Sequence, residues 1–245
     1  MSSMSPDGLS EAKRRLLDRY LRGEAGAEPP TPAAPAEAGP IPASWGQRQV
    51  WLHSQLADLP IYNEPVTIHR RGPLDRSALS RSLAEIVRRH EAWRTGFAGD
   101  STALFQVVHP PFSPAIDFVD LREVVPEARE GRALSIAAAD ARRPFDLAAP
   151  PLFRATLVRM GDDEHRLYLT LHHIIFDGVS IYRVFLPELA AIYEAFSRGL
   201  PSPLPEPALP YRKYAREKSA EEPSEESLNW SSGPKIKQMI ARTSD

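Results

Sequence analysis

Apolar and polar residues alternate with a period of two over residues 167–171, which is typical of a strand with one buried face. Residues 152–159 also have a strand-like apolar pattern, and the Gly-Asp-Asp-Glu segment at 161–164 favours a turn. We therefore predict a β-hairpin with strands at 152–159 and 165–173. Shorter strands are predicted at 66–68, 104–108 and 116–119.

Helical spacing of apolar residues is clearest after Asp75, whose side chain is a good helix cap. The apolar stripe of this helix consists of Leu79, Leu83, Ile86 and Val87, and the pattern ends near His90. Ser44 can cap a second helix that ends near residue 57. A weaker, alanine-rich helix is predicted over residues 127–142.

A longer helix is predicted over residues 179–198, with Gly199 as its stop. Pro187 inside this segment should kink the helix or break it in two. The chain therefore mixes helices and strands without regular strand–helix–strand alternation. We predict the α/β fold class, with a mixed sheet flanked by helices.

The composition divides the chain into three regions. Residues 9–22 place apolar side chains on one stripe and residues 24–43 are mostly Ala, Pro, Glu and Gly, so we expect 1–43 to form a helix and a disordered linker. Such a helix can dock on the chain's own globular part or on a partner protein, and both remain open. Residues 44–215 carry the core-forming patterns. Residues 216–245 are charged without such a pattern, so we expect a truncated or disordered tail.

The overall composition argues against several classes of partner. The 245 residues are 42% hydrophobic, which allows a sizeable core, and a net charge of −2 argues against nucleic acid as a partner. The absence of cysteine fits a reducing compartment. The sequence shows neither a signal-like N-terminus nor a run of about 18 apolar residues. We therefore expect a cytoplasmic protein without a membrane partner.

The candidate chemistry follows the predicted hairpin, in the string His-His-Ile-Ile-Phe-Asp-Gly at residues 172–178. If the strand continues through the pair, His173 shares a face with the leucines of that strand and His172 lies on the other face. Asp177 and Gly178 then occupy the following turn, where glycine allows a bend or a close backbone approach. Adjacent strand residues cannot easily share one ion, and the other histidines show no metal-ligand spacing, so we predict no metal site.

Four segments together resemble the condensation domain of nonribosomal peptide synthetases. They are SWGQRQVWL at 44–52, RHEAWRTGF at 89–97, HHIIFDG at 172–178 and YRKYA at 211–215. The second segment departs from the family pattern because Trp93 stands where leucine is usual. Order and spacing otherwise agree from about residue 44 to residue 215.

The resemblance implies a fold like that of chloramphenicol acetyltransferase. A complete condensation domain has two such lobes arranged as a V, with the active site in a tunnel between them. Those domains are much longer than the matching stretch of this chain. We therefore expect the N-terminal lobe alone, with its motifs intact and one wall of the tunnel missing.

The resemblance also implies amide formation. A donor acyl or peptidyl thioester on one carrier protein is attacked by the amine of an aminoacyl group on a second carrier. The domain needs no cofactor of its own, because the phosphopantetheine arms belong to the donor and acceptor carriers. The other implied partners are the missing C-terminal lobe and neighbouring synthetase modules.

By the same resemblance His173 is the catalytic residue. A neutral imidazole can accept a proton or orient an amine, and the sequence leaves both roles open. His172 is expected to be a supporting residue. Its presence argues against the cyclisation relatives of the family, which carry aspartate there, whereas the epimerisation relatives remain possible.

The other site residues implied by the resemblance are Asp177, Gly178 and Arg94. We expect Asp177 to be a buried carboxylate that pairs with an arginine and so fixes the loop that aims His173. Arg94 is the preferred partner, and Arg89 is the second choice. Gly178 is expected to allow a tight turn, or alternatively to place its N–H near the reacting carbonyl.

Two other interpretations stay open. The chain could be a non-catalytic remnant or a carrier-docking module that keeps the fold without turnover. It could also be an acetyltransferase-like enzyme that self-associates, so that neighbouring copies complete each site. Whether the single lobe is an active enzyme is left undecided by the sequence.

Overall fold

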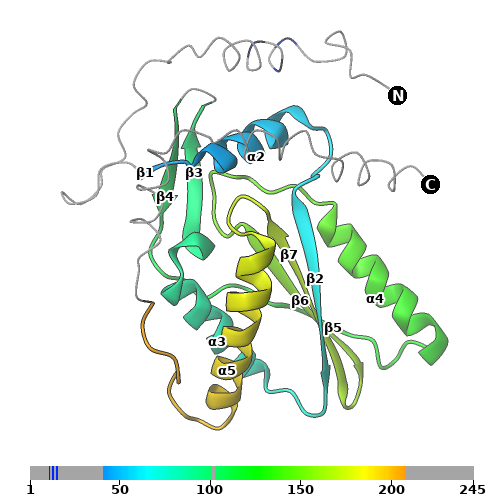
Figure 1. Cartoon of the computed structure of the whole chain (residues 1–245). Coiled ribbons are helices and arrows are strands. Elements are labelled where there is room, and N and C mark those ends of the chain that lie inside the picture. The colour runs from blue at the N-terminus through cyan, green and yellow to red at the C-terminus, as the bar shows by residue number, and fades with distance from the viewer. Residues whose placement is uncertain (1–10, 12, 14, 16–40, 101–102, 208–245) are drawn as a thin grey trace.

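The computed structural model describes residues 11, 13, 15, 41–100 and 103–207 (Figure 1). Most of the expected N-terminal helix and linker, the segment at 211–215 and the tail at 216–245 lie outside the described residues. Within the described part, no helix combines the length and the apolarity needed to cross a membrane.

The predicted strands and helices of this part are all present, with bounds that differ by a few residues from the predictions. Along the chain the elements are β1 (Ile41–Pro42), α2 (Trp45–Leu56), β2 (Asn63–Arg71), α3 (Arg76–Arg89), the 3₁₀ helix η2 (Glu91–Arg94), β3 (Thr95–Gly99), β4 (Leu104–Val108), β5 (Asp117–Asp120), α4 (Pro126–Ala141), β6 (Phe153–Gly161), β7 (Glu164–His172), the π-helix η3 (Ser180–Phe185) and α5 (Leu186–Ser197).

The strands form two sheets (Figure 1). The larger sheet has the order β2-β7-β6-β5, in which β5 and β6 are parallel and the other neighbours are antiparallel. The smaller sheet has the order β1-β4-β3 and is antiparallel throughout. The predicted α/β class with a mixed sheet flanked by helices is confirmed, whereas the separate small sheet was not predicted.

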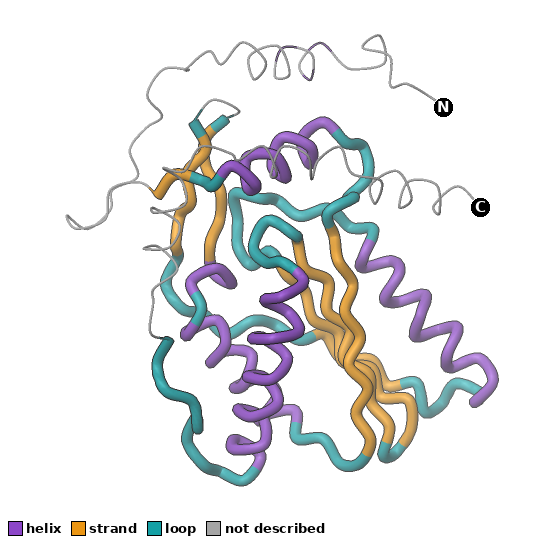
Figure 2. The backbone as a smooth tube through the Cα atoms, viewed as in Figure 1, coloured by secondary structure: helices purple, strands orange, loops and turns teal. Residues whose placement is uncertain are grey.

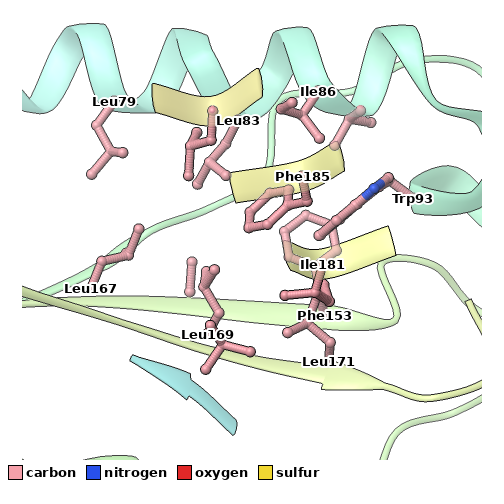
Figure 3. Packing of buried hydrophobic residues seen from close by; sticks show 14 of the residues in the cluster. Leu79, Leu83, Ile86, Trp93, Phe153, Leu167, Leu169, Leu171, Ile181 and Phe185 are labelled. Atoms are coloured by element: carbon pink, nitrogen blue, oxygen red, sulfur yellow. The ribbon is translucent and has the colours of Figure 1, made fainter. Parts of the chain in front are cut away.

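Helices α3 and α5 lie side by side over one face of the larger sheet (Figure 1). Leu167, Leu169 and Leu171 alternate along β7 and point into this layer, as period-2 alternation requires. Leu83 of α3 and Phe185 of η3 meet them from the helical side (Figure 3). This layer is the main hydrophobic core.

Trp93 completes the main core next to the end of β7. Its ring stacks on Phe185, with centroids 4.6 Å apart, and meets Phe153 edge-on at 4.9 Å (Figure 3). Aromatic pairs in these arrangements stabilise a core by about 0.5–1.5 kcal/mol beyond their buried area. Trp93, which is 7% exposed, therefore anchors this end of the core.

A second cluster joins α4 to the same sheet. Ala133 of α4 is buried together with Val158 and Met160 of β6 and Tyr168 of β7. Since Tyr168 alternates with the leucines of the main core, this cluster lies on the opposite face of β7. The larger sheet is therefore covered by helices on both faces.

A third cluster links α2, the small sheet and the segment after β7. Its buried members are Ala43, Phe97, Leu104, Leu147, Leu152, Ile174 and Ile175. Ile174 and Ile175 belong to the histidine string predicted to carry the chemistry. The backbone of that string is thus packed against α2 and the small sheet.

Local capping explains where two helices begin. Asp75 accepts hydrogen bonds from the backbone N–H groups of Ser77 and Ala78, at 2.8 and 3.0 Å. Ser44 and Gln47 form a reciprocal capping box at the start of α2, with the Ser44 N–H donating to Gln47 Oε1 at 2.9 Å. Both caps were predicted from the residue types.

The last helix changes its hydrogen-bond geometry next to Pro187, where the sequence predicted a kink or a break. The chain forms the wider π-helix over η3 and becomes α-helical at Leu186. Proline lacks the N–H that the α-helical ladder needs, which accounts for a change of hydrogen bonding at this point. Gly199, with a φ of 72°, ends α5 as predicted, and Leu200 N–H donates to the Ala195 carbonyl at 2.9 Å.

Lys13 is one of the three described positions of the N-terminal segment, and the backbone there is helical. Its ammonium group donates to the carbonyl of Leu56 at 3.1 Å and to Asp58 at 2.5 Å. A cation at the end of α2 also complements the helix dipole. The N-terminal segment therefore contacts the chain's own globular part at this residue.

Candidate active site

The histidine string forms the turn between β7 and η3, close to α2 (Figure 2). β7 ends at His172, because its partner strand β2 begins at Asn63, which lies opposite His172. The prediction that the strand runs through the pair is therefore wrong by one residue, and His173 is the first residue of the turn. Ile174 and Ile175 anchor the turn, with exposed fractions of 3% and 8%.

The His172 side chain is buried and both of its ring nitrogens have partners. Nδ1 accepts a hydrogen bond from the Ile174 N–H at 3.3 Å, so this nitrogen carries no proton. Nε2 then bears the proton and donates to Ser54 Oγ at 3.3 Å, while the Ser54 hydroxyl donates to the Val50 carbonyl at 2.7 Å. The hydrogen bonds thus assign one neutral tautomer, which ties the turn to α2.

Burial of His172, reinforced by the neighbouring His173, lowers the pKa of its imidazole to about 4. Desolvation disfavours the charged form of histidine, and no carboxylate among the described residues offsets it. His172 is therefore neutral at neutral pH. Its geometry supports a structural function in the turn, in line with the supporting role expected from the sequence.

His173 is held through its backbone and its ring. Its N–H donates to the Tyr62 carbonyl at 2.9 Å, which continues the β2–β7 pairing by one bond. The half-buried imidazole stacks on Phe176, with centroids 5.2 Å apart and planes 27° apart, and Tyr62 meets it nearly edge-on at 6.4 Å. Among the described residues, no hydrogen bond to a ring nitrogen of His173 is formed.

Asp177 caps the helix that follows the turn. Its carboxylate accepts hydrogen bonds from the Ser180 N–H at 2.7 Å and the Ser180 hydroxyl at 2.5 Å. The hydrogen bond from the Ser180 side chain is the main cause that lowers the pKa of Asp177, and the electrostatic effect of nearby His173 adds to it. Asp177 is exposed in this lobe, so the prediction of a buried carboxylate is wrong.

The predicted pairing of Asp177 with Arg94 or Arg89 is also wrong. Arg94 donates to the carbonyl of His109, and its guanidinium lies 3.8 Å from the Glu91 carboxylate. Arg89 instead pairs with Glu188 of α5 at 3.2 Å. The local cap at Ser180 satisfies the Asp177 carboxylate, so that no distant cation is needed to hold it.

Gly178 differs from its prediction as well. Its φ is not positive, whereas Gly72, Gly99 and Gly199 have positive φ, and a Cβ at Gly178 would meet no atom within 4 Å. Neither the backbone conformation nor the neighbours in this lobe require glycine at this position. The expected tight turn is therefore not its function here, and the alternative involving its N–H remains a prediction.

Gln47 belongs to the first of the four motifs, but the sequence did not indicate a role for it. It is buried in α2, and its side-chain amide donates to Gln106 Oε1 at 3.3 Å and to the Ile174 carbonyl at 3.4 Å. Gln106 in turn donates to the Pro42 carbonyl at 3.2 Å. This network connects the histidine turn to β1 and β4 of the small sheet.

Tyr62 and Ser54 were not predicted as site residues. The Tyr62 hydroxyl lies 2.7 Å from His53 Nδ1, and burial raises the pKa of this phenol. Ser54 follows Gln47 by seven residues, so both polar side chains lie on the same face of α2. Polar residues on the inward face of a helix are the one signal that could have identified Ser54 and Gln47.

A cavity of about 500 Å³ lies beside the turn. Its lining includes Trp93 and Arg94 of η2, Phe176 of the turn and Ser180 and Val184 of η3. Arg94 therefore shares a cavity wall with the turn, and it also bonds to the His109 carbonyl and lies close to Glu91. Of the five predicted site residues, the structure brings together four in one turn and leaves Arg94 across this cavity.

The chain matches known proteins along most of its length. Residues 37–231 match the family model described as the condensation domain. One of the linear gramicidin synthase proteins of Brevibacillus parabrevis is 42% identical over 162 residues, which cover 66% of this chain and 2% of that protein. Chondramide synthase of Chondromyces crocatus is 40% identical over 199 residues, which cover 81% of this chain and 5% of that protein.

The fold also matches a solved structure, the first condensation domain of the calcium-dependent antibiotic synthetase in complex with a substrate analogue. The TM-score is 0.62 at 29% identity, and the match covers 69% of this chain but only 40% of that chain. This partial coverage agrees with the predicted single lobe of the chloramphenicol acetyltransferase type.

These relatives do not favour the interpretations of the chain as a non-catalytic remnant, a docking module or a self-associating acetyltransferase-like enzyme. Their names connect the chain with synthetases, and the matched residues 37–231 contain the histidine turn and the Ser44–Gln47 cap. This chain belongs to the condensation-domain family of the nonribosomal peptide synthetases, of which it spans one part.

Proposed function

We propose that this chain forms the N-terminal half of an active site that joins a carrier-bound acyl or peptidyl thioester to a carrier-bound amine. The observation that supports this proposal is the intact histidine turn. It presents the imidazole of His173 at the end of the larger sheet, half-buried and with no hydrogen bond from the described protein residues. Such an imidazole is free to interact with a reactant.

In the proposed reaction the amine nitrogen attacks the thioester carbonyl carbon. A C–N bond forms and the C–S bond breaks, while the proton lost by the amine ends on the departing thiolate. No oxidant, reductant or metal is required by this balance. Both thiols belong to phosphopantetheine arms of the carrier proteins, so we propose no cofactor bound by this chain itself.

We assign His173 to the attacking amine, which it can orient or deprotonate. General-base assistance of this kind contributes typically about 10²- to 10⁴-fold to a rate, so correct placement of the two arms must contribute much of the remainder. The neutral tautomer of His172 stabilises the turn through its hydrogen bonds with Ile174 and Ser54. Asp177 fixes the start of the next helix through Ser180.

We propose that the rest of the site comes from a second lobe and from neighbouring synthetase modules, because the chain matches 40% of the solved condensation-domain chain. The donor and acceptor carriers are the proposed partners. The lack of cysteine is compatible with a cytoplasmic site of action, where thiol-bearing carriers stay reduced.

The proposal can be tested in a reconstituted reaction. The chain would be combined with the C-terminal lobe of the related chondramide synthase condensation domain, and supplied with an acyl-loaded donor carrier and an aminoacyl-loaded acceptor carrier. We expect a condensed product on the acceptor carrier, detected by mass spectrometry. We expect His173→Ala to lower its rate by about 10²-fold or more.

The matched control is His109→Ala, which changes a histidine after β4 that is outside the turn. This variant should form product at the wild-type rate. Equal rates for wild type and His173→Ala would contradict the assignment of His173. A complete absence of product from wild type with the second lobe bound would contradict the proposed function.

A further inference from the structure

The orientation of a working histidine is commonly set by a hydrogen bond to one of its ring nitrogens. In this lobe, the described residues supply none for His173, and Asp177 of the same turn bonds to Ser180 instead. The backbone of His173 is fixed by the Tyr62 carbonyl at 2.9 Å. Another interaction must therefore restrict rotation of the imidazole about its side-chain bonds.

The ring of Phe176 is placed to supply that restriction. It stacks on the imidazole with centroids 5.2 Å apart and an interplanar angle of 27°, and Tyr62 approaches at 6.4 Å and 73°. These are the offset-stacked and edge-to-face geometries that aromatic rings prefer. The imidazole of His173 thus has one stacked and one T-shaped aromatic neighbour.

Phe176 also packs against other parts of the lobe. It packs against both the main core and the cluster that contains Ile174 and Ile175, and it lines the cavity next to Trp93 and Ser180. Packing against two clusters limits the positions that the partly buried ring can take. Its position is therefore determined by the fold and not by His173.

We propose that Phe176, assisted by Tyr62, is the positioning residue that sets the orientation of the His173 imidazole. This inference rests on the proposed function, because it concerns the residue assigned to the reaction. Stacking restricts the ring while leaving both nitrogens to the reactants. A hydrogen-bonded acid would instead occupy one of them.

The orientation can be measured on the chain alone, without turnover. In protein labelled with ¹³C at histidine Cε1, the resonance assigned to His173 by its loss in His173→Ala should carry a ring-current shift from Phe176. Phe176→Leu keeps an apolar side chain of similar size and should move this resonance. Phe176→Tyr keeps the ring and should leave it near the wild-type position.

The consequence for the reaction is measured in the reconstituted assay with the second lobe. A misplacement of about 1 Å can cost 10²-fold in rate, so we expect Phe176→Leu to lower kcat by about ten- to a hundredfold. KM for both loaded carriers should stay unchanged, and Phe176→Tyr should restore kcat. Phe118→Leu on β5, where the ring is 36% exposed, is the matched control and should change neither readout.

The outcomes separate the inference from the proposed function. An unmoved His173 resonance in a folded Phe176→Leu variant overturns the inference, as does a moved resonance with wild-type kcat. If Phe176→Leu fails to fold, the comparison is made on Tyr62→Leu, which removes the T-shaped neighbour. This variant should broaden or shift the His173 resonance. An unchanged His173 resonance in Tyr62→Leu overturns the inference. Absence of turnover in the wild type contradicts the proposed function, whereas an unmoved resonance contradicts the inference alone.

Discussion

His172 and His173 are adjacent, yet the fold gives them different chemistry. His172 is 4% exposed, and hydrogen bonds from Ile174 and to Ser54 consume both of its nitrogens. His173 lies one residue later, just past the end of β7, and its ring is left half-buried against Phe176. One histidine therefore builds the turn and the other is presented by it.

The buried state of His172 predicts a pH-dependent stability. Its pKa is about 4 in the folded chain against 6.5 for an ordinary histidine, so between these values the unfolded chain binds more protons. The stability associated with neutral His172 is present above pH 6.5 and is lost as the pH falls toward 4, by up to roughly 3 kcal/mol. Urea unfolding across this pH range should show the decline.

In His172→Asn, the free energy of unfolding should be lower at neutral pH but should fall less steeply toward pH 4. The matched control is His69→Asn, since His69 is exposed on β2. This control should retain the wild-type pH profile. A His172→Asn profile parallel to that of the wild type would show that His172 does not cause the acid sensitivity.

At the residue scale, the sequence predicted the members of the site more accurately than the interactions that hold them in place. The string from His172 to Gly178 does form one turn, because it follows a strand and is anchored by two buried isoleucines. The predicted partner of Asp177 was wrong, because a serine three residues later satisfies the carboxylate in place of a distant arginine. Which partner a carboxylate takes depends on distances in the folded chain. Residue type and sequence spacing do not specify those distances.

At the scale of elements, one ionic cluster connects the end of α3 to the start of α5. Glu188 lies 3.2 Å from Arg89 Nε and 2.8 Å from His90 Nε2. The Arg89 side chain is 3% exposed and also donates to the carbonyls of Leu204 and Pro205. The cluster thus holds two helices and the segment that follows them in one arrangement.

We expect Glu188→Ala to lower the free energy of unfolding by about 3 kcal/mol, because it leaves a buried guanidinium without its counter-ion. The loss should lie at the lower end of the range for buried pairs, since Arg89 keeps two carbonyl acceptors. Denaturant unfolding of the purified variant measures this change.

Glu194→Ala is the control within the same helix. Glu194 pairs with Arg198, but these side chains are 64% and 66% exposed, so the change should stay below about 0.5 kcal/mol. Similar losses in the two variants would mean that the ion pair at Glu188 is no stronger than a surface pair.

Elements whose ends are set by nearby capping or stop residues were predictable from the sequence. Asp75 caps α3 and Gly199 ends α5, because each acts on the backbone a few residues away. The two-residue strand β1 and the separate small sheet were not predicted, since the pairing of Ile41 with Gln106 joins residues that share no local pattern. Long-range pairing is decided by packing of the whole lobe.

At the scale of the whole molecule, the family resemblance predicted the overall fold, which the hydrophobic patterns alone could not. Motifs over residues 44–215 indicated a lobe of known fold, and the match to residues 37–231 and to a solved condensation domain confirmed it. The lobe also exposes apolar side chains beside the histidine turn. Val179, Tyr182 and Val184 are 67%, 65% and 40% exposed on the segment that follows Gly178.

We expect this exposed apolar surface to be covered when a second lobe completes the proposed site. Tyr182→Ser should change the free energy of unfolding of the chain by less than about 0.5 kcal/mol, because the side chain is 65% exposed. It should nevertheless weaken binding of the chondramide synthase C-terminal lobe, measured by calorimetry, since apolar area is lost from the interface. Leu134→Ser changes a residue that is 53% exposed on α4, across the larger sheet, and should bind like the wild type. Equal affinities for all three proteins would place the lobe interface elsewhere and remove the reason for the apolar residues beside the turn.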